Sequence, residues 1–387
     1  MLMINVSLVF CFPTYIMKLG LLAMKKLVEL IKPPKKLHTL IFFVTSRCNA
    51  LCRTCFYWEE LNKRGDLTFE EIEKLSRTMP PFHDLLLSGG EPSLRSDLPQ
   101  IVNLFYKNNG IRRIYFPTNG LKPQRIKELI EKILEENGLL EVYLNNSIDG
   151  LPETNDRIRG VPGNFKKSLE TIRLAQTLKP RFGHRLQINV NSVICSENCD
   201  ELVELGNFFL QNERLDYHYF QIVRGNPMDK NLKKVPAKEL KNLYRKVTEI
   251  QRIYAQRQAE DRGVLEGWIR KSVYAAVFNF HHQTQFNNYT EDAPWPMPCT
   301  AGETAVVIDY DGGVRACELR GSLGNIRDYG CDFRAFWNSK IRSDEVDSIA
   351  RDKCFCTHIC FLHDSMRFSP RVRFWELPKS YITGHFW

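Results

Sequence analysis

The sequence predicts an α/β fold in which a partial (β/α)6 barrel of the TIM type is followed by a small C-terminal module. Short apolar stretches alternate with helix-like segments through residues 40–227, and such alternation favours a parallel sheet that right-handed crossovers curl into a barrel. Polar or glycine-containing segments follow several of these stretches, at the strand ends where such barrels bind ligands. A second cluster of cysteines begins near residue 298. We therefore expect an N-terminal extension, the barrel, a helical linker or lid, and a cysteine-containing domain, at residues 1–39, 40–227, 228–297 and 298–387.

The composition is that of a globular protein with a sizeable core, since 43% of the 387 residues are hydrophobic and 26% are charged. The net charge is +9, but no basic stripe is interleaved with stacking aromatics, so we expect no nucleic-acid partner. Most of the 12 cysteines fall into clusters with the spacing of metal ligands, which indicates a reducing cytoplasm rather than disulfides. Four cysteines stand apart and are expected to be buried thiols: Cys11, Cys195, Cys199 and Cys331.

The N-terminal extension carries apolar side chains at helical spacing through residues 18–31, which predicts an amphipathic helix packed on the protein. The alternative is a weak contact of residues 18–36, which are rich in lysine, with an anionic membrane surface. The apolar residues 1–10 have no basic flank and are soon followed by Pro13, so we expect neither a membrane span nor a signal peptide there.

The first barrel strand, residues 40–44, leads into three cysteines at C-x3-C-x2-C spacing, Cys48, Cys52 and Cys55. Three thiolates on one short loop can hold three corners of a [4Fe–4S] cluster, which normally takes four, so one iron is left open for another ligand. A structural zinc loop is the alternative, although no second cysteine pair or histidine pair lies at a matching distance nearby.

The next elements continue the alternation. Thr68 and Glu71 form a capping box at the start of a helix over residues 67–75. The apolar strand 84–88 then runs into Gly89-Gly90-Glu91-Pro92, where glycines permit a close approach to the backbone. The remaining barrel elements are expected in the order helix 98–108, strand 113–116, turn 117–120, helix 123–136, strand 140–145, helix 165–177, strand 185–194, helix 199–211 and strand 215–223.

Two pairs of residues further along the chain carry separate expectations. Asn189 and Asn191 lie two apart on one strand, so their side chains point the same way. His281 and His282 are adjacent in the second of two helical tracts, 236–258 and 267–285, and are expected to be a solvated pair without a metal.

The C-terminal region begins with Cys299 and reaches Cys317 through an Asp-Gly-Gly turn, the signature of a hairpin that brings both cysteines to the same side. Cys354, Cys356 and Cys360 supply three more sulfurs at C-x-C-x3-C spacing. These five candidates suffice for one [4Fe–4S] cluster, and a zinc site is the alternative.

Together, the three-cysteine loop, the Gly-Gly-Glu-Pro turn, the segment 146–150 and the Arg-Gly-x-x-Gly-x-Phe segment 159–165 resemble the radical SAM superfamily. The resemblance implies a [4Fe–4S] cluster on the three cysteines and S-adenosylmethionine on its open iron, with a low-potential electron donor such as flavodoxin or ferredoxin. It implies that the cofactor contacts come from Gly89, Gly90, Glu91, Thr118, Asn119, Ser147, Arg159, Asn189 and Asn191. One departure is Thr54, where the family usually has an aromatic side chain.

The C-terminal cysteines resemble the SPASM extension of this family, which binds auxiliary clusters, in its shortened twitch form. The resemblance implies one auxiliary [4Fe–4S] cluster, with Cys299, Cys317 and Cys360 as the firmest ligands and Cys354 and Cys356 competing for the last place.

The implied activity is reductive cleavage of S-adenosylmethionine to a 5′-deoxyadenosyl radical, which takes hydrogen from a substrate. A peptide or protein side chain is the leading expectation, although no winged-helix domain for docking a peptide is recognisable. A sugar, an aminoglycoside-like molecule or a lipid-pathway molecule is the alternative. The competing class is a non-catalytic iron–sulfur electron carrier, in which the glycine turn, Ser147 and Arg159 would be unnecessary. No catalytic side chain is singled out.

Overall fold

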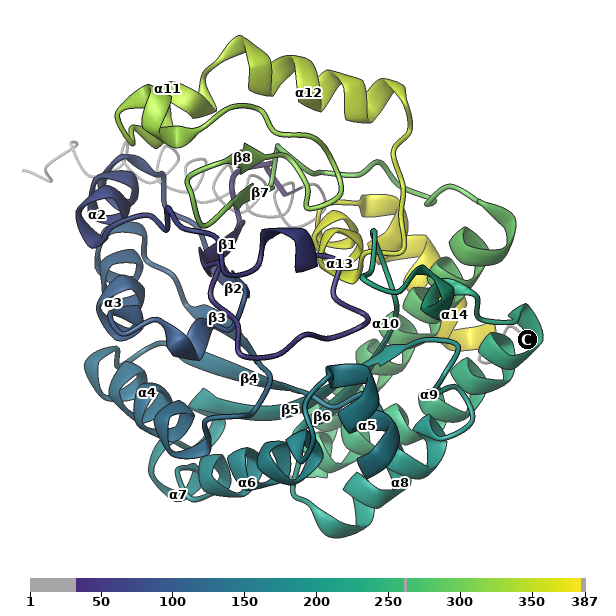
Figure 1. Cartoon of the computed structure of the whole chain (residues 1–387). Coiled ribbons are helices and arrows are strands. Elements are labelled where there is room, and N and C mark those ends of the chain that lie inside the picture. Colours follow the sequence, from purple (N-terminus) through teal and green to yellow (C-terminus); the bar gives the residue numbers. More distant parts are fainter. Residues whose placement is uncertain (1–32, 261–262, 384–387) are drawn as a thin grey trace, which may run out of the picture.

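The computed structural model describes residues 33–260 and 263–383 and contains a curved sheet surrounded by helices (Figure 1). The strand order is β6-β5-β4-β3-β2-β1-β7-β8, and the first six strands are all parallel to their neighbours. These six strands confirm the predicted partial barrel. Their bounds are β1 Thr39–Thr45, β2 Asp84–Gly89, β3 Arg113–Thr118, β4 Glu141–Ser147, β5 Leu186–Ile194 and β6 Tyr217–Ile222.

Helices α2, α3, α4, α6 and α8 cover the outside of this sheet (Figure 1). The capping box predicted for α2 is present, since Glu71 N donates to Thr68 Oγ1 at 3.2 Å and Thr68 N donates to Glu71 Oε2 at 2.8 Å. The α-helices are α2 Phe69–Thr78, α3 Leu98–Asn109, α4 Pro123–Glu136, α5 Pro152–Arg159, α6 Asn164–Gln176, α7 Lys179–Phe182, α8 Leu202–Asn212, α9 Ala237–Glu260, α10 Val264–Glu291, α11 Phe333–Trp337, α12 Lys340–Arg351, α13 Ile359–Arg367 and α14 Leu377–Thr383.

The pleat of the strands sends apolar side chains toward the helices and polar ones toward the interior of the barrel. On β3, Ile114 and Phe116 are fully buried, whereas Tyr115 between them is only half-buried. Such alternation is what a strand with two different faces requires. Because the strands are parallel and in register, with Ser147 opposite Asn191, their carboxyl ends meet at one edge of the sheet.

The C-terminal part of the chain extends the same sheet. Strand β7, Ala305–Ile308, pairs in parallel with β1, and β8, Val314–Arg315, pairs antiparallel with β7. This confirms the hairpin predicted from the Asp-Gly-Gly turn. It also places Cys317 just beyond β8, on the side of β1 away from β2.

Helices α9 and α10 pack directly on the barrel. Gln251 Nε2 donates to the carbonyl of His218 at 3.1 Å, which ties α9 to β6. The expectation that His281 and His282 are solvated is wrong, because these side chains are 1% and 0% exposed. The reason is that α10 has neighbours on both sides: His282 Nδ1 lies 2.8 Å from Thr248 Oγ1 of α9, and α14 packs along the same helix (Figure 1).

Several N-terminal predictions, the helix over residues 18–31 and the buried thiol of Cys11 among them, fall on residues that the structure does not describe. Of the other isolated cysteines, Cys195 and Cys331 are buried as expected and Cys199 is half-buried. Among the described residues, no helix has the length and apolar character needed to cross a membrane.

Candidate functional site

The three-cysteine loop follows β1 directly, and hydrogen bonds from its own backbone shape it. Cys48 N donates to Asn62 Oδ1 at 2.9 Å, and Cys55 N donates to the carbonyl of Cys52 at 3.0 Å. Before the loop, Ser46 N donates to Asp66 Oδ1 at 3.1 Å. These bonds position all three cysteines at the carboxyl end of β1, where the sequence predicts them.

The loop then docks on the end of α5. Arg53 N donates to the carbonyl of Ile158 at 2.8 Å. Gly160 has φ +68°, and a Cβ atom there would lie 2.4 Å from the carbonyl oxygen of Leu51. Only glycine permits both the backbone conformation and this close approach. The contact brings Arg159, the last residue of α5, against the cysteines.

Arg159 is held in a buried ion pair with Asp149, at 3.3 Å between Nη1 and Oδ2. The Asp149 side chain is fully buried, and its Oδ1 accepts a hydrogen bond from Val193 N at 2.7 Å. Arg159 Nε is buried and has no partner among the described residues. The guanidinium therefore keeps one donor available beside the loop.

The three thiols lie close enough to one another and to Arg159 to interact electrostatically. Burial raises the pKa of Cys48 to about 11 and that of Cys55 to about 12, and neighbouring thiols of the loop add to both shifts. Burial also raises the pKa of Cys52, against which the charge of Arg159 acts. A bound metal would shift this balance toward thiolates, because only the thiolate is a ligand.

The Gly-Gly-Glu-Pro turn packs beneath the loop. A Cβ atom on Gly90 would lie 2.1 Å from the carbonyl oxygen of Arg47, and Gly89 has φ +110°. Glu91 is buried, and its carboxylate accepts hydrogen bonds from Thr118 Oγ1 at 2.9 Å and Asn119 N at 2.7 Å. The Glu91 side chain thus joins the ends of β2 and β3.

The other predicted cofactor contacts lie at the same end of the sheet. Asn119 Nδ2 donates to Asn49 Oδ1 of the cysteine loop at 2.8 Å. Ser147 ends β4, opposite Asn191 on β5. Asn189 and Asn191 share a face as predicted, and the buried Asn189 Oδ1 has no partner within the described part of the chain.

The second group of cysteines comes together around the end of β8 and the start of α13. Burial raises the pKa of Cys299 to about 11 and that of Cys356 to about 12, and Cys354 adds to both shifts. Burial also raises the pKa of Cys317, and Cys356 and Cys299 add to this shift. Cys360 differs: its pKa is raised to about 12 by burial, and its strongest charged neighbours are Glu318 and Arg224.

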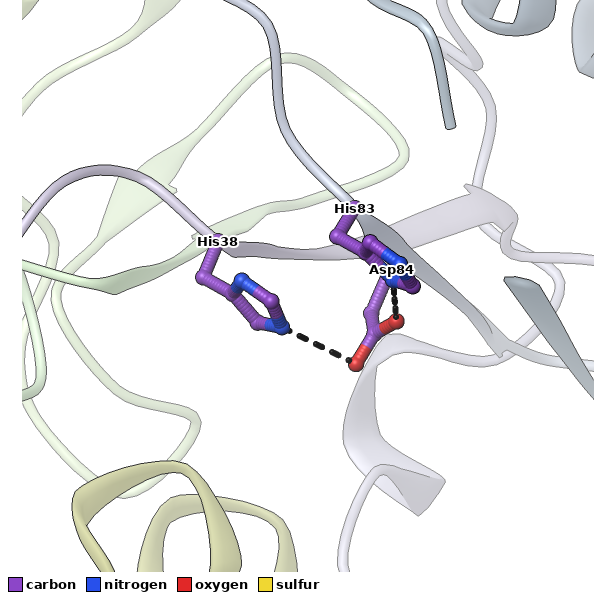
Figure 2. Close-up of side chains that lie close together, drawn as sticks. All are labelled: His38, His83 and Asp84. Atoms are coloured by element: carbon purple, nitrogen blue, oxygen red, sulfur yellow. Dashed lines mark hydrogen bonds and ion pairs between the residues drawn. The ribbon is translucent and has the colours of Figure 1, made fainter. Parts of the chain in front are cut away.

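A third cluster, His38, His83 and Asp84, was missed by sequence reasoning (Figure 2). His38 Nε2 lies 3.5 Å from one carboxylate oxygen of Asp84, and His83 Nδ1 lies 2.7 Å from the other. Arg113 Nε donates to the same carboxylate at 2.8 Å, and Arg367 approaches it at 3.4 Å. Two guanidinium groups already neutralise Asp84, so this cluster anchors the amino ends of β1 and β2 and is poorly suited to a cation.

In the described residues, the His38 cluster is the one group whose three ligand atoms lie within 4.8 Å of one another. In the same described residues, no three cysteine sulfurs lie within 4.8 Å of one another. Ligands of one tetrahedral zinc ion, with Zn–S bonds of about 2.3 Å, lie roughly 3.8 Å apart. Both cysteine groups are therefore more widely spaced than the ligands of a single zinc ion.

Residues 42–205 match the family model described as "Radical SAM superfamily". The chain is 33% identical over 161 residues to Fe-coproporphyrin III synthase from Methanosarcina barkeri, which covers 41% of this chain and 39% of that protein. It is 34% identical over 186 residues to GTP 3′,8-cyclase from Aquifex aeolicus, covering 46% of this chain and 54% of that protein. The chain thus spans about half or less of the length of these relatives.

Solved structures share the fold at low sequence identity. The structure of anSMEcpe with bound AdoMet and Cp18Cys peptide has a TM-score of 0.55 and 17% identity, and the match covers 90% of this chain and 99% of that one. Streptococcus suis SuiB bound to S-adenosylmethionine has a TM-score of 0.54 and 15% identity, covering 81% of this chain and 68% of that one. At these identities the likeness shows the shared architecture.

Proposed function

The chain belongs to the radical SAM superfamily through its domain at residues 42–205, and from this premise we propose that it cleaves S-adenosylmethionine to start radical chemistry on a substrate. When bound, the cluster and the cofactor supply a 5′-deoxyadenosyl radical that takes a hydrogen atom from the substrate. The observation that carries the proposal is the convergence of Cys48, Cys52, Cys55 and Arg159 with the glycine turn at one end of the barrel.

The residues of this site fit the cofactors. Three cysteines of one loop lie within electrostatic reach of one another and are spaced more widely than the ligands of one zinc ion, which favours a cluster. The buried Arg159 keeps an unpaired Nε–H beside Cys52, a donor suited to a carboxylate. Gly90 leaves the backbone of the turn uncovered by a side chain. These residues bind and orient the cofactors, and the packed barrel around them excludes water.

The second cysteine group supports an auxiliary [4Fe–4S] cluster in a domain that we place at residues 298–387. We propose Cys299, Cys317, Cys354 and Cys356 as its ligands, because each of these thiols is an electrostatic neighbour of at least one other in the set. This assignment revises the expectation from residue matching, which preferred Cys360. Loss of a four-iron cluster from Cys354→Ala, but not from Cys360→Ala, is the expected result of iron and sulfide analysis.

The substrate we propose is a peptide or protein side chain. Support comes from the fold shared with anSMEcpe and with SuiB, which has been solved bound to the precursor peptide SuiA. A small-molecule substrate is the second candidate, because the relatives with 33% and 34% identity are a synthase of Fe-coproporphyrin III and a GTP cyclase. We further propose that flavodoxin or ferredoxin supplies the electron to the cluster. We also propose that the protein is cytoplasmic.

The test is anaerobic incubation of the reconstituted protein with S-adenosylmethionine and dithionite. We expect 5′-deoxyadenosine from the wild type and none from Cys52→Ala. A wild-type protein with intact clusters that forms no 5′-deoxyadenosine is the result expected of an electron carrier, and it would refute the enzyme proposal. Parallel incubations with deuterium-labelled peptides and with deuterium-labelled small molecules then separate the two substrate classes. The class that contains the substrate transfers deuterium to 5′-deoxyadenosine.

A further inference from the structure

Arg224, just beyond β6, lies between the two cysteine groups. Its Nη2 donates to Glu318 Oε2 at 3.1 Å, and Glu318 directly follows Cys317. On the other side, the centre of its guanidinium lies 4.6 Å from the centroid of the Phe56 ring, and Phe56 directly follows Cys55. A single side chain therefore touches the neighbour of a cysteine in each group.

The backbone after β6 fixes Arg224 in this place. Gly225 has φ +65°, and a Cβ atom there would lie 3.0 Å from Phe56 Cβ and 3.2 Å from Leu319 Cδ2. Met228 N donates to the carbonyl of Cys55 at 3.1 Å. The segment is thus clamped between the first cysteine loop and the residues that follow Cys317, so Arg224 has little freedom to move away.

The charged partner of Arg224 is buried, and one donor of Arg224 itself has no hydrogen-bond partner among the described residues. Glu318 is 3% exposed in its side chain and also contacts Nε2 of His358, which is fully buried and lies between Cys356 and Cys360. Arg224 Nε, in contrast, is buried without a partner among residues 33–260 and 263–383. A buried donor on a charged group costs free energy when it is left unpaired. The Nε–H of Arg224 is therefore free to donate to an acceptor outside the polypeptide.

We propose that Arg224 is a positioning residue for the auxiliary cluster, with its Nε–H available to a sulfur of that cluster, and that it raises the reduction potential of the cluster. The inference rests on the proposed function, since it requires a cluster on the second cysteine group. Reduction adds negative charge, and hydrogen bonds and net charge around the sulfurs are known determinants of such potentials. The negative charge of Glu318, which follows Cys317, lowers the reduction potential of the cluster.

The experiment is a redox titration of the purified, reconstituted protein followed by electron paramagnetic resonance, with dithionite as reductant. Arg224→Gln is expected to keep both clusters and to shift the auxiliary midpoint to lower potential, whereas Glu318→Gln shifts it to higher potential. Midpoint shifts of opposite sign in Arg224→Gln and Glu318→Gln indicate an electrostatic role. A loss of packing alone gives no reason for the two variants to shift the midpoint in opposite directions. Arg224→Lys, which keeps the charge but lacks Nε–H, is expected to fall between Arg224→Gln and the wild type.

Arg173→Gln is the matched control, since it removes a guanidinium paired with a buried carboxylate, Glu213, at 2.7 Å on the outer helix α6. It should leave both midpoints unchanged. If Arg224→Gln does not fold, Arg224→Lys and Glu318→Gln still decide the question. An auxiliary midpoint that matches the wild type in the variants that fold overturns the role of Arg224, whereas a wild-type protein with only one cluster refutes the proposed auxiliary site.

Discussion

Replacing Gly90 by alanine tests the way in which the glycine turn supports the cysteine loop. The added Cβ would lie 2.1 Å from the carbonyl oxygen of Arg47, well below the 3.0 Å that real Cβ contacts reach, so turn and loop must separate by at least about 0.9 Å. The carbonyl oxygen belongs to the backbone and the position of the Cβ is fixed by the backbone of residue 90, so no rotamer change relieves the clash. Overpacking of this kind costs typically about 1–3 kcal/mol, and a misplacement of about 1 Å at a reacting centre can lower a rate about 100-fold.

The assay measures the initial rate of 5′-deoxyadenosine formation, with iron content and the urea midpoint of unfolding measured in parallel. Gly138→Ala is the matched control, because an added Cβ there meets nothing within 4 Å. We expect Gly90→Ala to lose about 100-fold in rate while Gly138→Ala stays near the wild type. A Gly90→Ala protein that forms 5′-deoxyadenosine at the wild-type rate would show that the turn does not determine the position of the loop.

Three further predictions concern single side chains. Arg159→Lys, which retains charge but loses the Nε–H, should weaken binding of S-adenosylmethionine to the reconstituted protein roughly 10- to 100-fold, as expected for a hydrogen bond of a charged group worth about 1.5–3 kcal/mol; an unchanged Kd contradicts the assigned role. Cys360→Ala should retain formation of 5′-deoxyadenosine that Cys52→Ala abolishes, and equal loss in both variants argues against two separate sites. Asp84→Asn should lower the free energy of unfolding at pH 7 by about 1.5–3 kcal/mol, because the buried carboxylate loses its charged hydrogen bonds to the half-buried Arg113 and Arg367. Burial would raise the pKa of Asp84, but the surrounding histidines and arginines hold it well below its usual range. The stability from Asp84 is therefore present above its unfolded pKa of about 3.9 and is lost as the pH falls below it, so the difference between wild type and Asp84→Asn in urea titrations should shrink below about pH 4; a constant difference would contradict this.

The sequence was informative about the first site because its residues follow strands along the chain. Cys48, Gly89 and Ser147 each stand at or just beyond the end of an apolar stretch, and parallel strands in register bring such ends together. Local periodicity therefore predicted both the barrel and the convergence of these residues.

Burial and long-range contacts were beyond the reach of the sequence. His281 and His282 lie in a helix of mixed polarity, and only the packing of α9 and α14 on both sides of α10 buries them. The anchoring of Asp84 by Arg367 joins residues 283 positions apart, for which no local pattern exists.

The barrel, the three-cysteine loop and the glycine turn could all be predicted from the sequence, because each is encoded by residues close together in the chain. The tertiary structure decided which groups meet across long separations. It extended the barrel sheet with β7, brought Cys299, Cys317, Cys354 and Cys356 within electrostatic reach of one another, and placed Arg224 between the two cysteine groups. Such contacts depend on how whole elements pack, since a side chain that is unremarkable along the chain acquires its partners only when the strands and helices around it are assembled.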